Sequence, residues 1–463
     1  MRTLDWTLID IIRIGFTSRP WSDGEAPPEK PITLLISVQP DTTTWETGIE
    51  AAMACRAILR RFNIFDVEVE VMEACCEALN TETPNPHLKT EPVTGERTDA
   101  NLQLSELIGT SIASIESPSV EGTKGFYVRL EDHPERLLAV TCQHVLFGRN
   151  AKNEDYHHIE TDRKVVIQPG DGTWTDTIEL LQVCIDRCQA RIDCATRLLA
   201  TNSSDVLGAT SIEATSLNTE KAASEAWLSQ YHEIQELGKR AIGHVLFSPR
   251  YSVSNSGPAR PERLRDWALI ELDQAKHETP FSAQKNAIVG GHTADILFDK
   301  ARAKELSRDV RRKYPNKLQI DNNMGTIVLA DKCVPDKELR DPEEESMSLD
   351  EPAKLVAKFG RSSGLTAGVR NEVKSVKRTI DGAHELISDE WCTMGAKTMG
   401  DNSRLPFSTK GDSGSCIFDM EGRIAGLLTS GKGPGGAYDL AYVTPMEWLL
   451  HDIRSFGYQV YLA

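Results

Sequence analysis

The sequence lacks a long apolar run. No stretch reaches the roughly 18 apolar residues that a membrane span needs, and Asp5 and Asp10 interrupt the N-terminal region where a signal peptide would need a continuous apolar core. We therefore expect a soluble, unexported, cytoplasmic protein without a membrane partner.

The sequence is also poor in positive charge. It carries 52 Lys and Arg residues against 69 Asp and Glu residues, a formal net charge of −17 at pH 7. Such a surface repels the phosphate backbone of nucleic acids instead of neutralising it. Nucleic acid is therefore not an expected partner.

The cysteines show no disulfide framework. Ten are present, singly or close together in apolar segments, as at Cys142 and Cys416, so reduced and mostly buried thiols are expected. Cys184, Cys188 and Cys194 invite a metal interpretation, but they lack the paired C-x2-C spacing of such sites. We expect no metal there.

The N-terminal region has the pattern of a small β-α-β domain. The chain is long enough for two or three domains, and residues 1–80 contain an apolar strand at 32–38, a helix at 45–62 and a strand at 66–71. Glu68 and Glu70 could belong to a carboxylate cluster with Glu73, but alternation with valines puts the first two on the wet sheet face. Residues 81–104 form a candidate linker, since prolines break any regular element between 80 and 99.

A helical insertion is expected at about 176–241. Apolar residues step by three and four in the first helix, which is a heptad seam: Ile178, Leu181, Ile185, Cys188, Ile192, Ala195 and Leu199. A second helix is expected at about 220–241, after a polar segment at 201–218, with these apolar residues: Ala223, Trp227, Ile234, Leu237 and Ala241. Together they predict an antiparallel coiled-coil hairpin inserted into a β domain.

The rest of the chain has the pattern of a β domain. A helix is expected near 300–313 and an acidic loop at 341–351, and the other segments are short strand-like runs punctuated by glycine. Such spacing indicates a β-barrel or a sandwich.

The segment with the sharpest chemical signal is 410–415, which reads K-G-D-S-G-S and leads into an apolar run. A serine hydroxyl needs a base to take its proton and backbone N–H groups to hold the oxyanion that forms. Glycines let the backbone approach that closely. Taken alone, Gly-Asp-Ser-Gly can be an ordinary turn.

Two further residues complete a catalytic pattern around Ser413. His144 ends an apolar strand at 137–146, where a general base can be held rigidly, and Asp266 opens the apolar run 267–272, where it can orient an imidazole. Either one alone is more often structural, as a strand-end histidine or a cap. Together, in the order His, Asp, Ser, they predict a catalytic triad.

At this point the sequence resembles the trypsin-like (chymotrypsin-fold, S1-type) serine protease family. The family's T-A-A-H, D-[IW]-A-L-[IL] and G-D-S-G motifs correspond to T-C-Q-H at 141–144, D-W-A-L-I at 266–270 and G-D-S-G at 411–414. Segments 358–368, 422–428 and 441–445 resemble later strands of intracellular, bacterial and viral members. The whole pattern resembles uncharacterised intracellular trypsin-like-domain proteins of fungal type.

The resemblance implies a fold and a set of site residues. It implies a chymotrypsin-like double β-barrel over residues 105–463, within a multidomain α+β chain, and a serine endopeptidase that needs no cofactor. The backbone N–H groups of Gly411 and Ser413 would form the oxyanion hole. The residues implied for substrate binding are Thr429, Ser430, Gly431 and Phe407, the last at the base of the primary pocket.

Phe407 offers no carboxylate to pair with a cation, so we expect uncharged residues on the acyl side of the cut bond. The tetrapeptide 288–291, Ile-Val-Gly-Gly, resembles the activation site of secreted relatives, but it follows both His144 and Asp266. We therefore expect no zymogen cleavage there, and we expect Asp412 to have another partner that keeps the oxyanion loop formed.

Three competing interpretations differ in class. An α/β-hydrolase does not fit, because its nucleophile needs glycine two residues later, where Ser415 stands, and its chain order runs Ser, Asp, His. A protease-shaped binding or sensor module with an idle site remains an alternative. Such a module would recognise a protein partner through the N-terminal domain or the hairpin. A structural interaction protein built around the hairpin, which would self-associate through it, is the other alternative.

Overall fold

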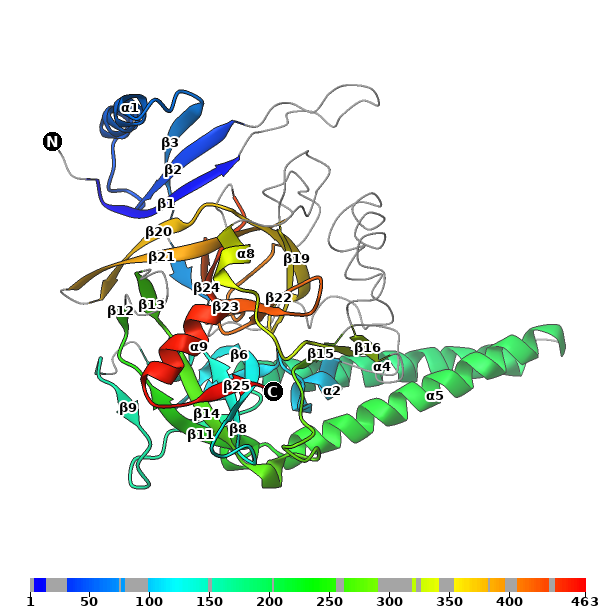
Figure 1. The fold of residues 1–463 in the computed structure, drawn as a ribbon. Helices are drawn as coiled ribbons and strands as arrows, with labels where there is room; N and C mark the ends of the chain where they lie inside the picture. Colours follow the sequence, from blue (N-terminus) through cyan, green and yellow to red (C-terminus); the bar gives the residue numbers. More distant parts are fainter. Residues whose placement is uncertain are drawn as a thin grey trace.

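The fold was analysed in a computed structural model of the chain (Figure 1). The described residues are 4–13, 31–74, 76–79, 99–148, 152–201, 204–254, 262–289, 319–321, 326–340, 354–381, 384–395, 406–432 and 438–463. The chain is of mixed α and β class, with several sheets.

The N-terminal unit contains the predicted strand, helix and strand. These are β2 (Ile32–Val38), α1 (Trp45–Arg61) and β3 (Val67–Glu73), and β2 and β3 are parallel. The acidic residues of β3 are more exposed than its valines, as the alternation predicted. An additional strand, β1 (Trp6–Arg13), was not predicted. It pairs with β2 on one side and with β20 (Ser375–Asp381) on the other, so the unit extends a larger sheet (Figure 1).

That larger sheet has eleven strands among the described residues, in the order β19-β18-β22-β23-β24-β21-β20-β1-β2-β3, with β4 paired to β23. Its remaining members are β4 (Cys76–Ala78), β18 (Lys354–Gly360), β19 (Gly364–Arg370), β21 (His384–Gly395), β22 (Cys416–Asp419), β23 (Ile424–Lys432) and β24 (Leu440–Pro445). β19 also pairs with β21.

A second sheet has nine strands in the described part of the chain, in the order β25-β7-β8-β14-β11-β10-β5-β6, with β9 paired to β11. They are β5 (Ser111–Ser114), β6 (Ser117–Thr123), β7 (Phe126–Leu130), β8 (Leu137–Thr141), β9 (Tyr156–His157), β10 (Val165–Ile167), β11 (Ala241–Ser248), β14 (Ala268–Leu272) and β25 (Val460–Leu462). These pairings do not by themselves establish the expected double barrel, which stays a prediction.

The described residues also contain smaller elements, including a two-stranded sheet of β12 and β13 and a three-stranded sheet in the order β15-β17-β16. The strands are β12 (Ser252–Ser254), β13 (Arg263–Arg265), β15 (Ala287–Val289), β16 (Gln319–Asp321) and β17 (Thr326–Val328). The helices are α2 (Asp99–Leu104), α3 (Gln143–Leu146), α8 (Asp336–Arg340), α9 (Met446–Ser455) and the 3-10 turns η1 (Leu237–Arg240) and η2 (Gln274–Lys276). Helix α2 occupies the end of the predicted linker.

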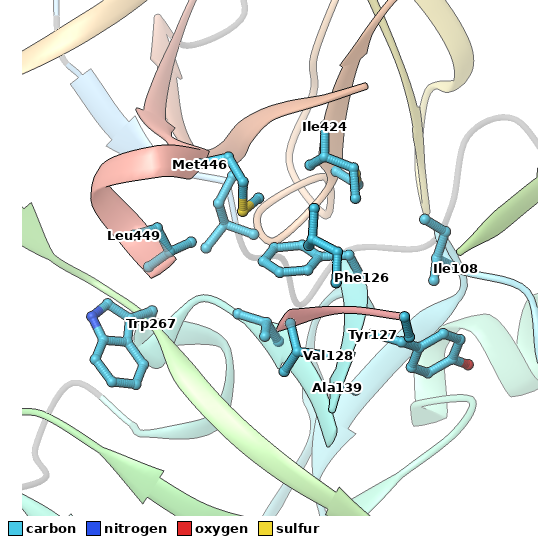
Figure 2. Close-up of a cluster of buried hydrophobic side chains, with 14 of the residues drawn as sticks. Ile108, Phe126, Tyr127, Val128, Ala139, Trp267, Ile424, Met446 and Leu449 are labelled. Atoms are coloured by element: carbon cyan, nitrogen blue, oxygen red, sulfur yellow. The ribbon is translucent and has the colours of Figure 1, made fainter. Parts of the chain in front are cut away.

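One hydrophobic core lies between the two sheets. Figure 2 shows Phe126 and Val128 of β7 on the same cluster as Ile424 of β23 and Met446 and Leu449 of α9, and all five are buried. Because this core includes residues from both sheets, it fixes the position of one sheet relative to the other.

The predicted helical hairpin is present, with different bounds. Helix α4 (Asp171–Thr201) packs along α5 (Ser204–Glu233), and the hairpin extends away from the sheets (Figure 1). Ion pairs and hydrogen bonds match positions in antiparallel order, as between Trp174 Nε1 and the Tyr231 carbonyl at 3.1 Å and between Lys221 and Gln189 at 2.8 Å.

The second helix corrects the prediction. It begins at residue 204, inside the segment expected to be a polar connection, and it ends before 234–241. Its buried seam is Leu217, Ser224 and Tyr231, seven residues apart, whereas Ala223 is exposed. The polar residues from 210 to 216 lie mostly on the exposed surface of a long helix. Exposed helix positions do not need apolar side chains, so a polar segment can still be helical.

Several expectations fall on other parts of the chain. The helix near 300–313, the acidic loop at 341–351 and residues 81–98 lie outside the described residues. Ile288 and Val289 are in strand β15, paired with β17. Across the described ranges, no helix has the length and apolar character needed to cross a bilayer.

Candidate active site

The pairing of β8 with β14 brings His144 and Asp266 together. Residue 268 at the start of β14 lies opposite residue 141 at the end of β8, because the strands are antiparallel. His144 follows β8 in the short helix α3, and Asp266 precedes β14 by two residues. Two positions that are 122 residues apart in the sequence therefore meet at one edge of the sheet.

The three predicted catalytic side chains form a continuous hydrogen-bonded chain. His144 Nδ1 lies 2.7 Å from Asp266 Oδ2, and His144 Nε2 lies 2.8 Å from Ser413 Oγ. The backbone N–H of His144 also donates to Asp266 Oδ1 at 3.1 Å. The carboxylate therefore fixes both the ring and the backbone of the histidine.

Electrostatics favour an ionised Asp266. Burial alone would raise the pKa of this carboxyl group, but the charge and the hydrogen bonds of His144 outweigh burial and hold the pKa below its ordinary value. A carboxylate here stabilises the imidazolium that forms when His144 accepts a proton.

The loop 411–414 is held in a shape that only glycine adopts easily at two positions. Gly411 has φ +101° and Gly414 has φ +90°, in the left-handed region. A Cβ atom at Gly411 would lie 2.1 Å from Ser362 Oγ, and one at Gly414 would lie 2.3 Å from Thr141 Oγ1. The two glycines thus fit between neighbours that leave no space for a side chain.

Asp412 anchors this loop from inside. Its fully buried carboxylate lies 3.2 Å from the ammonium group of Lys358 and accepts hydrogen bonds from the backbone N–H groups of Ser362, Ser363 and Thr409. Burial alone would raise the pKa of Asp412, but Lys358 and these donors hold it below its ordinary value. Asp412 therefore has the alternative partner that the sequence required.

The two predicted oxyanion-hole donors point at one oxygen atom. The backbone N–H groups of Gly411 and Ser413 both donate to the carbonyl oxygen of Leu79, the latter at 3.3 Å. The N–H of Leu79 donates to Ser413 Oγ at 2.9 Å, and Ser413 Oγ is 3.0 Å from the carbonyl of Thr429. A peptide group of the chain itself thus lies in the candidate site.

Leu79 reaches the site because the preceding residues form a strand. β4 pairs antiparallel with β23, with Ala78 opposite Ser430 and Glu77 opposite Gly431. Two of the residues predicted to bind substrate, Ser430 and Gly431, therefore pair with residues 77 and 78 of the same chain.

The predicted pocket is apolar and filled. Leu79 is 2% exposed and belongs to the same buried cluster as Phe407, Val356 and Leu428. Gly431 lies at its edge, since a Cβ there would be 3.4 Å from Leu79 Cδ1. The structure thus gathers Phe407, Thr429, Ser430 and Gly431 around one leucine.

Four functional positions were missed from the sequence: Leu79, Asp439, Lys358 as the partner of Asp412, and Asp10, which pairs with Lys432 of β23 at 3.3 Å. The carboxylate of Asp439 accepts the backbone N–H of Phe407 at 2.8 Å and so positions the pocket base. A usable signal existed for Lys358 and Asp10, because each is the one charged residue in the interior of an apolar strand. Leu79 had no such signal.

One group in the described residues has metal-ligand atoms close together, Cys142, His144 and Asp266, within 4.8 Å. Both ring nitrogens of His144 already have protein partners. Burial raises the pKa of the Cys142 thiol well above its ordinary value, and the thiol donates to the Leu428 carbonyl. A neutral thiol is a poor ligand, so these residues fit hydrogen bonding better than metal binding.

No protein-family model matches this sequence, and a comparison with curated proteins gave no match. Any assignment of function therefore depends on the geometry. A hydroxyl, a base, an orienting carboxylate and two N–H groups around one carbonyl can together support attack of Ser413 on an acyl carbon.

Proposed function

We propose that this protein is a serine endopeptidase of trypsin-like type, with His144, Asp266 and Ser413 as its triad. The observation that carries the proposal is the convergence of the Ser413 hydroxyl, which is hydrogen-bonded to His144, and two backbone N–H groups on the backbone of one residue, Leu79. A merely structural serine would not require a base, an oriented imidazole and an oxyanion site around one carbonyl.

The proposed reaction has two stages. Ser413 Oγ attacks the carbonyl carbon of a peptide bond while its proton passes to His144 Nε2, and the oxyanion is held by the N–H groups of Gly411 and Ser413. His144 then protonates the leaving amine, which leaves an ester on Ser413. Water hydrolyses this ester by the same steps, with His144 as base and then as acid.

One strand pairing supports the C-terminal barrel of the fold that the trypsin-like resemblance implies. The pairing of β19 with β21 joins the two ends of the path β19-β18-β22-β23-β24-β21, as a C-terminal barrel would require. The loop that carries Ser413 lies beside helix α3, which follows β8 and carries His144.

The pocket favours an uncharged residue on the acyl side of the cut bond. Leu79 fills it together with Phe407, and the carboxylate of Asp439 is already bound to the Phe407 N–H. An unpaired cation there would lose its hydration without gaining a free carboxylate. We propose leucine and residues of similar size as the preferred type.

The proposal is tested by labelling with a fluorophosphonate probe, which reacts with activated serines. Ser413 has no exposed surface with Leu79 in place. The probe is therefore added to the full-length Leu79→Asp variant, because burial of a carboxylate in the apolar pocket is unfavourable and residue 79 should leave the site. Labelling that disappears in Leu79→Asp with Ser413→Ala supports the proposal. Absence of labelling in both favours an idle, protease-shaped binding module.

A further inference from the structure

We infer that this protein cuts its own chain between Leu79 and Asn80. The inference rests on the proposed protease function and assigns a substrate to it: the segment Cys76–Leu79, which we call the internal substrate. Four observations carry it, namely the register of the backbone, the position of one carbonyl, the fit of one side chain and the covering of the nucleophile.

The internal substrate lies on β23 as an added strand. β4 is antiparallel to β23, with Cys76 opposite Lys432 and Ala78 opposite Ser430. Extended peptides are recognised in this way because main-chain hydrogen bonds hold any sequence in one register. Leu79 is the next residue of the chain, and its N–H donates to Ser413 Oγ at 2.9 Å, so it lies beside the nucleophile.

The carbonyl group of Leu79 is the one that the site acts on. Its oxygen accepts from the N–H groups of Gly411 and Ser413, and its own N–H donates to Ser413 Oγ. The peptide bond that contains this carbonyl is the bond to Asn80.

The Leu79 side chain fills the primary pocket, and a charge pair holds the residue before Ala78. Leu79 is 2% exposed in the cluster that contains Phe407. The carboxylate of Glu77 lies 2.8 Å from the ammonium group of Lys410, three residues before Ser413. The segment is therefore complementary to the site in side chains as well as in backbone.

The internal substrate also excludes competitors. Ser413 is 0% exposed in this arrangement, so another peptide reaches it only after residues 76–79 leave. A segment on the same chain has a high effective concentration at the site. The first peptide bond that the triad can cut is therefore the bond after Leu79 in the same chain.

The step balances as an ordinary peptide hydrolysis. Ser413 Oγ bonds to the Leu79 carbonyl carbon and its proton moves to His144 Nε2. The bond from this carbon to the Asn80 nitrogen breaks, and that nitrogen takes the proton from His144. Water then replaces Ser413 on the carbonyl, which leaves a carboxylate at Leu79 and an amine at Asn80.

The experiment compares full-length wild-type protein with Ser413→Ala, both purified and incubated at several concentrations, by intact mass under denaturing conditions. The expected result is conversion of the wild type into fragments 1–79 and 80–463 at a rate independent of concentration, while Ser413→Ala stays whole. Tagged Ser413→Ala mixed with wild type is also expected to stay whole, because the reaction is intramolecular.

Variants at Leu79 separate recognition from folding. Leu79→Met, similar in volume, is expected to cut at a rate within about tenfold of wild type, whereas Leu79→Asp is expected to lose the cut at least 100-fold. Labelling of Ser413 by the fluorophosphonate probe in Leu79→Asp tests the proposed protease function independently of self-cleavage. The fragment masses identify the bond.

The outcomes are distinct. Wild-type protein that stays whole while Leu79→Asp labels at Ser413 overturns self-cleavage and leaves the protease standing, with residues 76–79 as an inhibitor. A whole wild type with no labelling of Leu79→Asp overturns both. Cutting that persists in Ser413→Ala, or that occurs at another bond, also overturns the inference.

Discussion

The carboxylate of Asp10 lies 3.3 Å from the ammonium group of Lys432, and both side chains are fully buried. Asp10 is in β1, near the start of the chain, and Lys432 ends β23, the strand that holds the internal substrate. The hydroxyl of Tyr442 also donates to Asp10 Oδ2 at 3.1 Å. The N-terminal unit is therefore bound to β23 by a buried ion pair.

This pair makes stability depend on Asp10. Asp10→Ala should lower the free energy of unfolding by about 3–5 kcal/mol, because it leaves the Lys432 ammonium buried without its charge partner. Urea denaturation followed by fluorescence measures the loss. Asp5→Ala is the control, since it removes an exposed pair with Arg378 and should cost under about 1 kcal/mol. Equal losses in both variants would contradict the role of Asp10.

Within the triad, Asp266 should matter through the orientation of His144. In the Leu79→Asp background, which uncovers Ser413, Asp266→Asn should lower kcat on a leucine peptide by on the order of 10⁴-fold, because an amide does not keep the imidazole in the required tautomer. His144→Ala should remove nearly all turnover, and the exposed His133→Ala should remove none. Full activity in His144→Ala would show that the triad assignment is wrong.

The size of the pocket should depend on Gly431. A Cβ at this position would lie 3.2 Å from Ser408 Oγ and 3.4 Å from Leu79 Cδ1, so Gly431→Val should narrow the pocket. Cleavage after leucine should fall roughly 100-fold, with a shift toward alanine. A peptide library measures the change. Gly238→Ala, where a Cβ meets nothing within 4 Å, should leave the preference as it was.

The oxyanion loop should depend on Asp412. Asp412→Asn leaves Lys358 buried without its ion-pair partner and loosens the N–H groups of Gly411 and Ser413, so kcat should fall by about 10²–10³-fold. KM should change much less. The folded-state pKa of Asp412 lies below its ordinary value, so its contribution to stability is present above about pH 4 and is lost as pH falls through the folded-state value.

Glu390 should make stability depend on pH in the direction opposite to that of Asp412. Burial raises the pKa of its carboxyl group from 4.5 to about 7, although Lys377 and Arg263 act against this rise. The folded state thus binds more protons than the unfolded state between these values, so stability falls as pH rises through this window. Glu390→Gln should reduce this fall, as urea midpoints at pH 5 and pH 8 would reveal. The exposed Glu385→Gln should not.

The residues of the site were predictable where local pattern and chemistry coincide. His144 follows the apolar strand β8, whereas Asp266 and Ser413 come just before the apolar strands β14 and β22. Antiparallel pairing of β8 with β14 brings the first two together. The unit β2, α1 and β3 was predictable from its period. Such patterns are local, so the sequence displays them directly.

What failed to be predicted is non-local. The pairing of β1 with β20 and of β4 with β23 joins segments that are more than 300 residues apart. β4 is three residues long, too short to show alternation. A lone charge in an apolar strand, such as Asp10, indicates that a partner exists without saying which residue it is.

The pairing of β1 with β20 changes what a cut after Leu79 produces. Strand β1 remains hydrogen-bonded to the larger sheet on one edge and to β2 on the other, so the piece 1–79 stays attached without a covalent link. The protein would then consist of two chains, and the smaller chain would carry the internal substrate, which covers Ser413. Access to Ser413 would then depend on the concentration of the 1–79 chain. Dilution, or a competitor that pairs with β20, would release this chain and expose Ser413. An excess of the 1–79 chain would cover Ser413 again.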